Sequence, residues 1–259
     1  MDKNLPIFEV LDELTAKLAK TKRVILTAPP GAGKSTVIPI GLNKNPAFSK
    51  GKIIMLEPRR LAVKQVASRM AQTLGEELGR TVGYRIRGEV KCGEKTKVEV
   101  VTEGILIRMI QEDQQLAGVS TIIFDEFHER SLNADLGLAF CLEIASVLRN
   151  DLKILVMSAT LEITAVSKMM QEAPIVSCEG KSFPVTPIWQ TKPVVQDQII
   201  GKLIIDVILE AISETKGSIL VFLPGEGEII KLASSLINKV PDNCYVFPLY
   251  GRLGFKDQQ

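Results

Sequence analysis

The sequence predicts an α/β fold in which helices cover both faces of a parallel sheet. Short apolar runs at 24–28, 52–56 and 121–125 alternate with longer segments of helical periodicity. Strands of a parallel sheet are apolar throughout because helices bury both of their faces, and these runs have that character. Each chemically suggestive motif follows such a run, at the edge where open α/β sheets bind their ligands.

Further elements continue this alternation along the chain. The pattern indicates strands at 81–87, 97–102 and 153–157, and helices at 5–18, 37–42, 61–78, 103–111 and 134–148. Glycine and proline residues interrupt it at 180–197, which indicates a linker. Beyond the linker, it predicts helices at 196–213 and 226–237 and strands at 218–223 and 244–247. We therefore expect a first domain over 1–190 and an incomplete second domain over 191–259.

Composition indicates a soluble, cytoplasmic protein. Hydrophobic residues make up 46% of the 259 and charged residues 24%, and no apolar stretch reaches the length of about 18 residues that a membrane span needs. The N-terminus carries acidic residues, unlike a signal peptide. Cys92, Cys141, Cys178 and Cys244 are widely separated, which favours free thiols in a reducing cytosol over disulfides or a metal site. The net charge of +2 means that nucleic-acid binding would depend on local arginines and lysines.

A glycine-rich segment before a predicted helix is typical of a phosphate-binding loop. Backbone N–H groups at a helix start point toward a phosphate, and glycine permits its close approach. Lys34 would reach the β- and γ-phosphates of ATP, and the Ser35 hydroxyl would bind Mg²⁺. The usual pattern has glycine at position 28, where this chain has alanine. The alternative interpretation of this segment is an ordinary glycine-rich turn before a helix that binds no phosphate. The residues assigned to the nucleotide are Pro30, Gly31, Ala32, Gly33, Lys34, Ser35 and Thr36.

A second motif, Asp125-Glu126-Phe127-His128, supplies acids after another buried run. Asp125 would hold Mg²⁺, and Glu126 would orient and help deprotonate the attacking water. The alternative is an acidic loop that caps the next helix, since Asp and Glu favour helix N-termini. The phosphate loop favours the metal site. His128 is the single histidine of the chain, and a lone histidine is more often structural than catalytic.

Three further motifs follow predicted strands. Arg59 and Arg60 oppose the dipole of the helix that they begin, so contact with an anionic backbone explains them better than local energetics, although a solvated basic patch is the alternative. Thr102 and Gly104 offer a hydroxyl and backbone N–H groups to a phosphate. The alternative is that these residues form an ordinary helix cap. The Ser158-Ala159-Thr160 segment would relay the state of the nucleotide, or cap the following helix.

These motifs, in the order APPGAGKST, LEPRRLA, VTEGIL, FDEFHERS and MSAT, resemble those of superfamily 2 helicases of the DEAH-box class, nearest the bacterial HrpB branch. That class often has alanine where this chain has Ala28. The resemblance implies two RecA-like domains, ATP and Mg²⁺ as cofactors, and a nucleic-acid partner, with RNA favoured over DNA.

The resemblance also implies a role for each matched residue. Lys34, Asp125 and Glu126 would be catalytic, and His128 would couple the nucleotide site to the second domain. Arg69 would stack on the nucleotide base. The residues implied to touch the strand or to link hydrolysis to its movement are Arg59, Arg60, Thr102, Gly104, Ser158 and Thr160.

The chain departs from this class at its end. The glutamine- and arginine-rich motif that supplies arginine fingers does not occur before Gln259. Because such arginines contribute about 10³–10⁵ in rate, we expect this chain to bind ATP and hydrolyse it slowly. Two alternatives stay open, a P-loop ATPase that remodels a protein partner and a truncated, non-catalytic nucleotide-binding module.

Overall fold

The computed structural model describes residues 5–159, 164–180, 184–189 and 202–254. The chain divides into two compact units, Met1–Phe183 and Pro184–Gln259. The strands of the first unit are Arg23–Thr27 (β1), Lys52–Leu56 (β2), Val82–Ile86 (β3), Glu89–Lys91 (β4), Val98–Val101 (β5), Val119–Phe124 (β6), Lys153–Ser158 (β7) and Ile175–Ser177 (β8).

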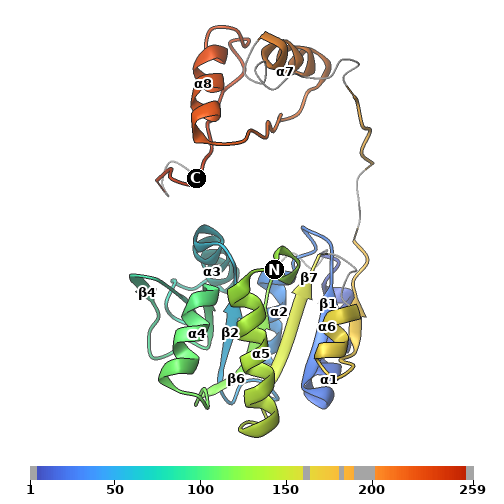
Figure 1. Cartoon of the computed structure of the whole chain (residues 1–259), viewed down its shortest axis with the longest axis vertical. Helices are drawn as coiled ribbons and strands as arrows, with labels where there is room; N and C mark the ends of the chain where they lie inside the picture. The colour runs from blue at the N-terminus through green and yellow to red at the C-terminus, as the bar shows by residue number, and fades with distance from the viewer. Residues whose placement is uncertain (1–4, 160–163, 181–183, 190–201, 255–259) are drawn as a thin grey trace. The chain divides into compact units, whose positions relative to one another are not determined.

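These strands form one sheet with the order β4-β3-β5-β2-β6-β7-β1-β8. Every neighbouring pair runs parallel except β3 and β4, which form an antiparallel hairpin. The helices of this unit are Phe8–Thr21 (α1), Lys34–Lys44 (α2), Arg60–Leu74 (α3), Glu103–Glu112 (α4), Leu132–Val147 (α5) and Thr164–Met169 (α6), with a single 3-10 turn at Phe127–Glu129 (η1) (Figure 1).

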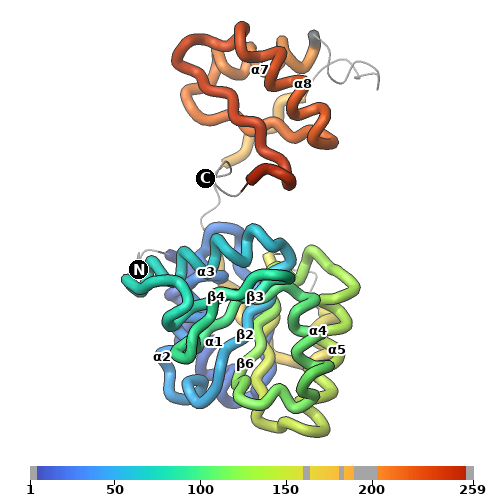
Figure 2. Tube along the Cα trace, turned by 90° about the vertical axis from the view of Figure 1, so that its left-hand side faces the viewer, coloured from blue at the N-terminus to red at the C-terminus, as the bar shows by residue number. Residues whose placement is uncertain are grey.

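Helices cover both faces of the sheet. Figure 2 shows α4 and α5 on one side of the strands and α1, α2 and α3 on the other. Successive residues of a strand point to opposite faces, so Val24 and Leu26 pack in the core under α1 to α3, while Ile25 joins the core under α4 and α5. This alternation between two buried layers confirms the predicted α/β fold.

The end of α3 and three short elements of the first unit differ from the sequence prediction. Helix α3 ends at Leu74 rather than at residue 78, because Gly75 adopts a left-handed conformation with φ 67° and its N–H bonds to Ala71 O and Gln72 O. A glycine in this position is a common helix stop. The short strands β4 and β8 and the short helix α6 were not predicted, since three to six residues carry little periodicity.

The second unit contains helices Lys202–Glu214 (α7) and Glu226–Leu236 (α8). Ile205, Ile208, Leu232 and Leu236 form its buried apolar cluster. The strands predicted at 218–223 and 244–247 were wrong, since neither segment is a strand in the structure. Apolar, β-branched composition produces a strand only where the backbone pairs with a neighbouring strand.

No helix within the described parts of the chain is long and apolar enough to cross a membrane.

Candidate nucleotide and nucleic-acid site

The five sequence motifs lie at the carboxyl ends of five consecutive strands. Along the sheet these strands are β5, β2, β6, β7 and β1. Because all five are parallel, their motifs emerge at a single edge. The first residues beyond or at these strand ends are Thr102, Glu57, Asp125, Ser158 and Ala28, respectively.

Backbone hydrogen bonds join these strand ends beyond the regular ladders. Ala28 N donates to Ser158 O at 3.1 Å, and Asp125 N donates to Leu56 O at 3.0 Å. Glu57 N likewise donates to Val101 O at 2.9 Å. The edge is therefore a continuous hydrogen-bonded structure, and it fixes the order of the motifs relative to one another.

The predicted phosphate loop is a tight turn that opens α2. Gly31 and Gly33 have φ angles of 79° and 95°, a region that side chains strongly disfavour. Gly33 is the N-cap of α2, and no side chain caps the helix, so the first N–H groups of α2 are available to an anion. Of the other residues assigned to the nucleotide, Pro30 is exposed and Ala32 is buried, while Thr36 and Ser35 are half-buried.

Lys34 is only 4% exposed, although it carries a positive charge. Its Nζ donates to Glu126 Oε1 at 2.6 Å. A buried ammonium requires a charged or hydrogen-bonding partner, and Glu126 provides one. A nucleotide phosphate would have to compete with this carboxylate for Lys34.

Asp125 is 4% exposed and has one carboxylate oxygen in use and one without a partner. Oδ1 accepts a hydrogen bond from Glu126 N at 2.9 Å, whereas Oδ2 is buried and unpaired. Burial raises the pKa of Asp125 to about 6, although the Ser35 hydroxyl and the Lys34 ammonium act to lower it. Such a buried, unsatisfied oxygen calls for a ligand.

The loop that follows Asp125 is strained at both ends of η1. Glu126 and Arg130 have φ angles of 48° and 46°, a region that costs non-glycine residues about 1–3 kcal/mol each. Phe127 anchors the loop by packing edge-to-face against Phe124, with ring centroids 6.0 Å apart. The Arg130 guanidinium lies over the Phe127 ring at 5.4 Å. These contacts stabilise the loop against that strain.

His128 lies between the acid motif and the end of β7. Its Nδ1 is 3.3 Å from Glu126 Oε2 and 3.4 Å from Ala159 N. A protonated Nδ1 pairs with the Glu126 carboxylate, whereas an unprotonated one accepts from the Ala159 N–H. His128 therefore lies where Glu126 meets the end of β7, and its Nδ1 pairs with Glu126 or with Ala159 but not with both at once. Its predicted coupling to a second domain stays a prediction.

Arg59 and Arg60 begin α3, as predicted from the sequence, and both are exposed. Arg59 Nη2 donates to Glu129 Oε1 at 2.5 Å, and Arg60 Nη2 donates to Arg87 O at 2.9 Å. The Glu129 carboxylate therefore offsets the unfavourable placement of an arginine at a helix start. Sequence reasoning missed Glu129, because its pairing with Arg59 depends on β2 and β6 being neighbours.

The structure also distinguishes two kinds of helix cap at this edge. Thr102 is the N-cap of α4 but makes no side-chain cap hydrogen bond, so capping does not account for its hydroxyl. Gly104 is exposed, and a Cβ added there would meet no atom within 4 Å, so packing does not require glycine. By contrast, Ser131 Oγ caps α5 by accepting from Ala134 N at 3.0 Å.

The remaining predicted site residues have the following positions. Ser158 is 2% exposed and ends β7. Thr160 lies outside the described residues. Arg69 lies on the exposed side of α3, and its assignment to the nucleotide base stays a prediction.

Glu57 is a second residue that sequence reasoning did not assign. It is 5% exposed, next to Asp125 at the sheet edge. Burial raises the pKa of Glu57 to about 8, the carboxylates of Asp125, Glu126 and Glu129 add to this rise, and Arg59 opposes it. Its signal in the sequence is the one that identified Asp125, an acid directly after a buried apolar strand.

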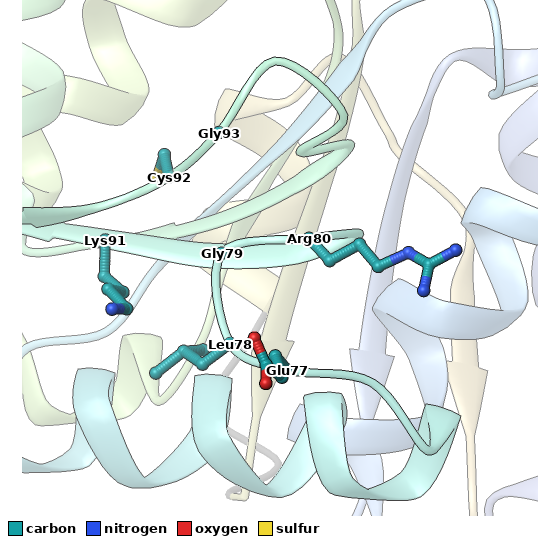
Figure 3. A pocket seen from close by; sticks show the side chains of 7 residues that line it. All are labelled: Glu77, Leu78, Gly79, Arg80, Lys91, Cys92 and Gly93. Carbon is teal, nitrogen blue, oxygen red and sulfur yellow. The ribbon is translucent and has the colours of Figure 1, made fainter.

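A cavity of about 450 Å³ lies away from these motifs, beside the β3–β4 hairpin. Its charged side chains, Glu77, Arg80 and Lys91, point in different directions in Figure 3 rather than toward a common point. Binding sites need convergent polar groups. This cavity is therefore a weaker candidate than the carboxyl edge of the sheet.

Comparison with known proteins decides the family. A model of the DEAD/DEAH box helicase family matches residues 10–169, which contain all five motifs. The chain belongs to this family. The resemblance expected from the motif order is thereby confirmed, and the sheet with helices on both faces is the RecA-like fold of its helicase relatives.

Individual relatives agree with this assignment. The chain is 46% identical to the ATP-dependent RNA helicase HrpB of Escherichia coli K12 over 99% of its length, and 37% identical to the ATP-dependent RNA helicase HrpA of Borreliella burgdorferi over its whole length. The crystal structure of E. coli DEAH/RHA helicase HrpB superposes on 98% of the chain with a TM-score of 0.88. The chain spans about a third of the length of these relatives, 31% and 32% of the two helicases and 32% of the crystallised chain.

Proposed function

We propose that this chain binds and hydrolyses ATP and couples hydrolysis to movement along a nucleic-acid strand, as an ATP-dependent RNA helicase of the HrpB type. The observation that supports it most is the shared sheet edge. There the phosphate loop and its paired acids, at β1 and β6, stand beside exposed arginines that follow β2. We also propose a first, RecA-like domain over 1–190 and part of a second over 191–259.

The nucleotide phosphates bind at the start of α2. The backbone N–H groups beyond Gly33 and the Lys34 ammonium hold the β- and γ-phosphates, and Lys34 exchanges its Glu126 partner for them. Arg69 holds the base.

Ser35 and Asp125 fit a magnesium ion. The unpaired, buried Oδ2 of Asp125 and the nearby Ser35 hydroxyl are hard oxygen donors of the kind that Mg²⁺ prefers. Among the described residues, no cluster of three or more acidic, histidine or cysteine side chains could hold a metal. This agrees with Mg²⁺, which is usually bound by few protein groups together with substrate phosphates. When bound, the ion neutralises charge on the transferred phosphoryl group.

Glu126 acts on the attacking water once phosphate has taken its place on Lys34. Its freed carboxylate then accepts a hydrogen bond from the water and orients it in line with the γ-phosphate. When this carboxylate moves, His128 Nδ1 exchanges Oε2, at 3.3 Å, for the Ala159 N–H, at 3.4 Å, and so transmits the change to Ala159. Ser158 and Thr160 relay that change to strand movement.

The nucleic-acid strand lies across the ends of β5 and β2. Arg59 and Arg60 bind its phosphates, Thr102 donates its hydroxyl, and Gly104 allows the backbone to approach α4 closely. Contacts of this kind do not read bases, so the preference for RNA rests on the names of the relatives. We also propose a cytoplasmic location, which the four free cysteines favour.

Binding measurements on the 259-residue chain test this function. We expect ATP with Mg²⁺ to bind the wild type and not Lys34→Ala in calorimetric titrations. A single-stranded RNA oligonucleotide should bind with reduced affinity to Arg59→Ala/Arg60→Ala, whose ATP affinity is unchanged. Equal ATP binding by wild type and Lys34→Ala would contradict the nucleotide site. Equal RNA binding by wild type and the double variant would favour an ATPase that acts on a protein partner.

A further inference from the structure

The loop between the nucleotide and nucleic-acid motifs is held by contacts on both sides. Glu129, at the end of η1, pairs with Arg59 at 2.5 Å. Ser131 Oγ donates to Glu103 Oε2 at 2.5 Å, and Glu103 is the first residue of α4, between Thr102 and Gly104. Each nucleic-acid motif is therefore joined by a side-chain contact to the loop that carries Glu126.

The ion pair between Arg59 and Glu129 is accessible to a competing anion. The Arg59 side chain is 70% exposed and that of Glu129 is 31% exposed. Guanidinium groups bind carboxylates and phosphates with the same planar, two-pronged geometry. A phosphate of a bound strand and the Glu129 carboxylate thus compete for one guanidinium.

A change at Glu129 reaches Glu126 through a single turn of backbone. Glu129 N donates to Glu126 O at 2.9 Å, which closes η1. The residues at the two ends of this turn, Glu126 and Arg130, have positive φ angles and keep them only while surrounding contacts restrain the loop. Release of Glu129 removes one of these restraints.

We propose that Glu129 is a positioning residue that holds Arg59 until a nucleic-acid phosphate displaces it, and that this exchange frees the loop so that Glu126 can leave Lys34 and reach the attacking water. The inference rests on the proposed function and adds to it the contact through which strand binding stimulates hydrolysis.

RNA affinity tests the first half of the inference. Glu129→Gln removes the competing charge, so we expect it to bind a single-stranded RNA oligonucleotide about two- to five-fold more tightly than wild type, the size expected for a partly exposed ion pair. Asp135→Asn is the matched control, because Asp135 forms another ion pair with this loop, to Arg130 at 2.9 Å, and has a similar exposure. Its RNA affinity should equal that of wild type.

A double-variant cycle locates the effect. In an Arg59→Gln background, Glu129→Gln should produce no gain in RNA affinity, because the guanidinium for which it competes is absent. A gain that persists in that background would overturn the inference, as would equal or weaker RNA binding by Glu129→Gln alone.

Single-turnover ATP hydrolysis tests the second half. We expect Glu129→Gln to hydrolyse ATP faster than wild type without RNA and at the same rate with saturating RNA, so that the stimulation ratio falls. A purely structural role would lower both rates, and an unchanged ratio would overturn the inference. Loss of the proposed function is separable, since it shows as ATP binding by Lys34→Ala or undiminished RNA binding by Arg59→Ala/Arg60→Ala.

Discussion

The two halves of one sheet edge differ in how far their charged side chains are exposed to solvent. In the proposed nucleotide half, at the ends of β6, β7 and β1, Lys34 and Asp125 are each 4% exposed. In the proposed nucleic-acid half, at the ends of β5 and β2, the Arg59 side chain is 70% exposed. Buried charges must be paired or change their protonation, whereas exposed charges stay hydrated and are screened by salt. The same strand-turn-helix unit thus places buried, paired charges in one half of the edge and exposed, hydrated charges in the other.

The largest expected effect is a loss of ATP turnover caused by a change in the proposed nucleotide half. Glu126→Gln removes the carboxylate that we propose acts on water, and we expect ATP turnover to fall about 10²–10⁴-fold. ATP affinity should rise, because a neutral amide competes less strongly than a carboxylate for the Lys34 ammonium. Single-turnover kinetics and calorimetric titration measure the two effects. Glu143→Gln, on the exposed side of α5, is the control. Weaker ATP binding by Glu126→Gln would show that the ion pair does not compete with phosphate.

The next effect concerns Glu57, where the two halves meet. Its pKa of about 8 lies above the ordinary value of 4.5, so between these pH values the folded protein carries a proton that the unfolded chain lacks. The free energy of unfolding therefore decreases as pH rises through this window and levels off above pH 8. Glu57→Gln should be more stable than wild type by on the order of 4–5 kcal/mol at pH 8.5, with the difference vanishing near pH 4.5.

Chemical denaturation across this pH range, in chelator and without nucleotide, measures the difference. Glu143→Gln should follow the wild-type curve, because that side chain is exposed. Parallel pH curves for Glu57→Gln and wild type would show that Glu57 is charged in the folded protein.

A smaller effect concerns the salt dependence of RNA affinity, which we expect to depend on the proposed nucleic-acid half. Arg59→Ala/Arg60→Ala removes two phosphate contacts, so the slope of log affinity for single-stranded RNA against log salt should decrease by about 1.4. Lys20→Ala/Lys44→Ala removes the same charge from helix ends at the opposite edge of the sheet and should leave the slope unchanged. Fluorescence anisotropy at several salt concentrations measures both. If the two double variants have equal slopes, the change reflects net charge alone and not phosphate contacts of Arg59 and Arg60.

The smallest effect contrasts two helix starts. Ser131→Ala loses an N-cap hydrogen bond and should reduce the free energy of unfolding by about 1 kcal/mol. Thr102→Ala loses no cap bond and should change it by less than about 0.5 kcal/mol while weakening RNA binding. Denaturation and RNA titration of both variants measure this contrast. A Thr102→Ala variant as unstable as Ser131→Ala would assign the hydroxyl to folding.

The sequence was most informative where chemistry follows a buried strand. Apolar runs before Lys34 and Asp125 were enough to predict one sheet edge, because parallel strands of similar length end together. Periodicity also predicted which helices would cover the sheet. The same reasoning placed the end of helix α3 too late in the chain. Both Gly75 and Gly79 are plausible stops, and only the backbone conformation distinguishes them.

Pairings across the edge could not be predicted from the sequence. Arg59 and Glu129 are 70 positions apart, and their contact requires β2 beside β6 and a particular side-chain conformation in each. The two strands predicted for the second unit failed for a related reason. Residues 218–223 have the composition of a strand, but composition does not supply the neighbour with which a strand must pair.

The outermost strands of the sheet have a consequence for solubility. Both β4 and β8 are only three residues long, and β4 places Glu89 and Lys91 at one rim. Short, charged edge strands leave few backbone groups for a second chain to pair with, which protects a protein from ordered aggregation. At the rim formed by β4, short length and charge act together, whereas at β8, Ile175–Ser177, only the short length of the strand limits such pairing.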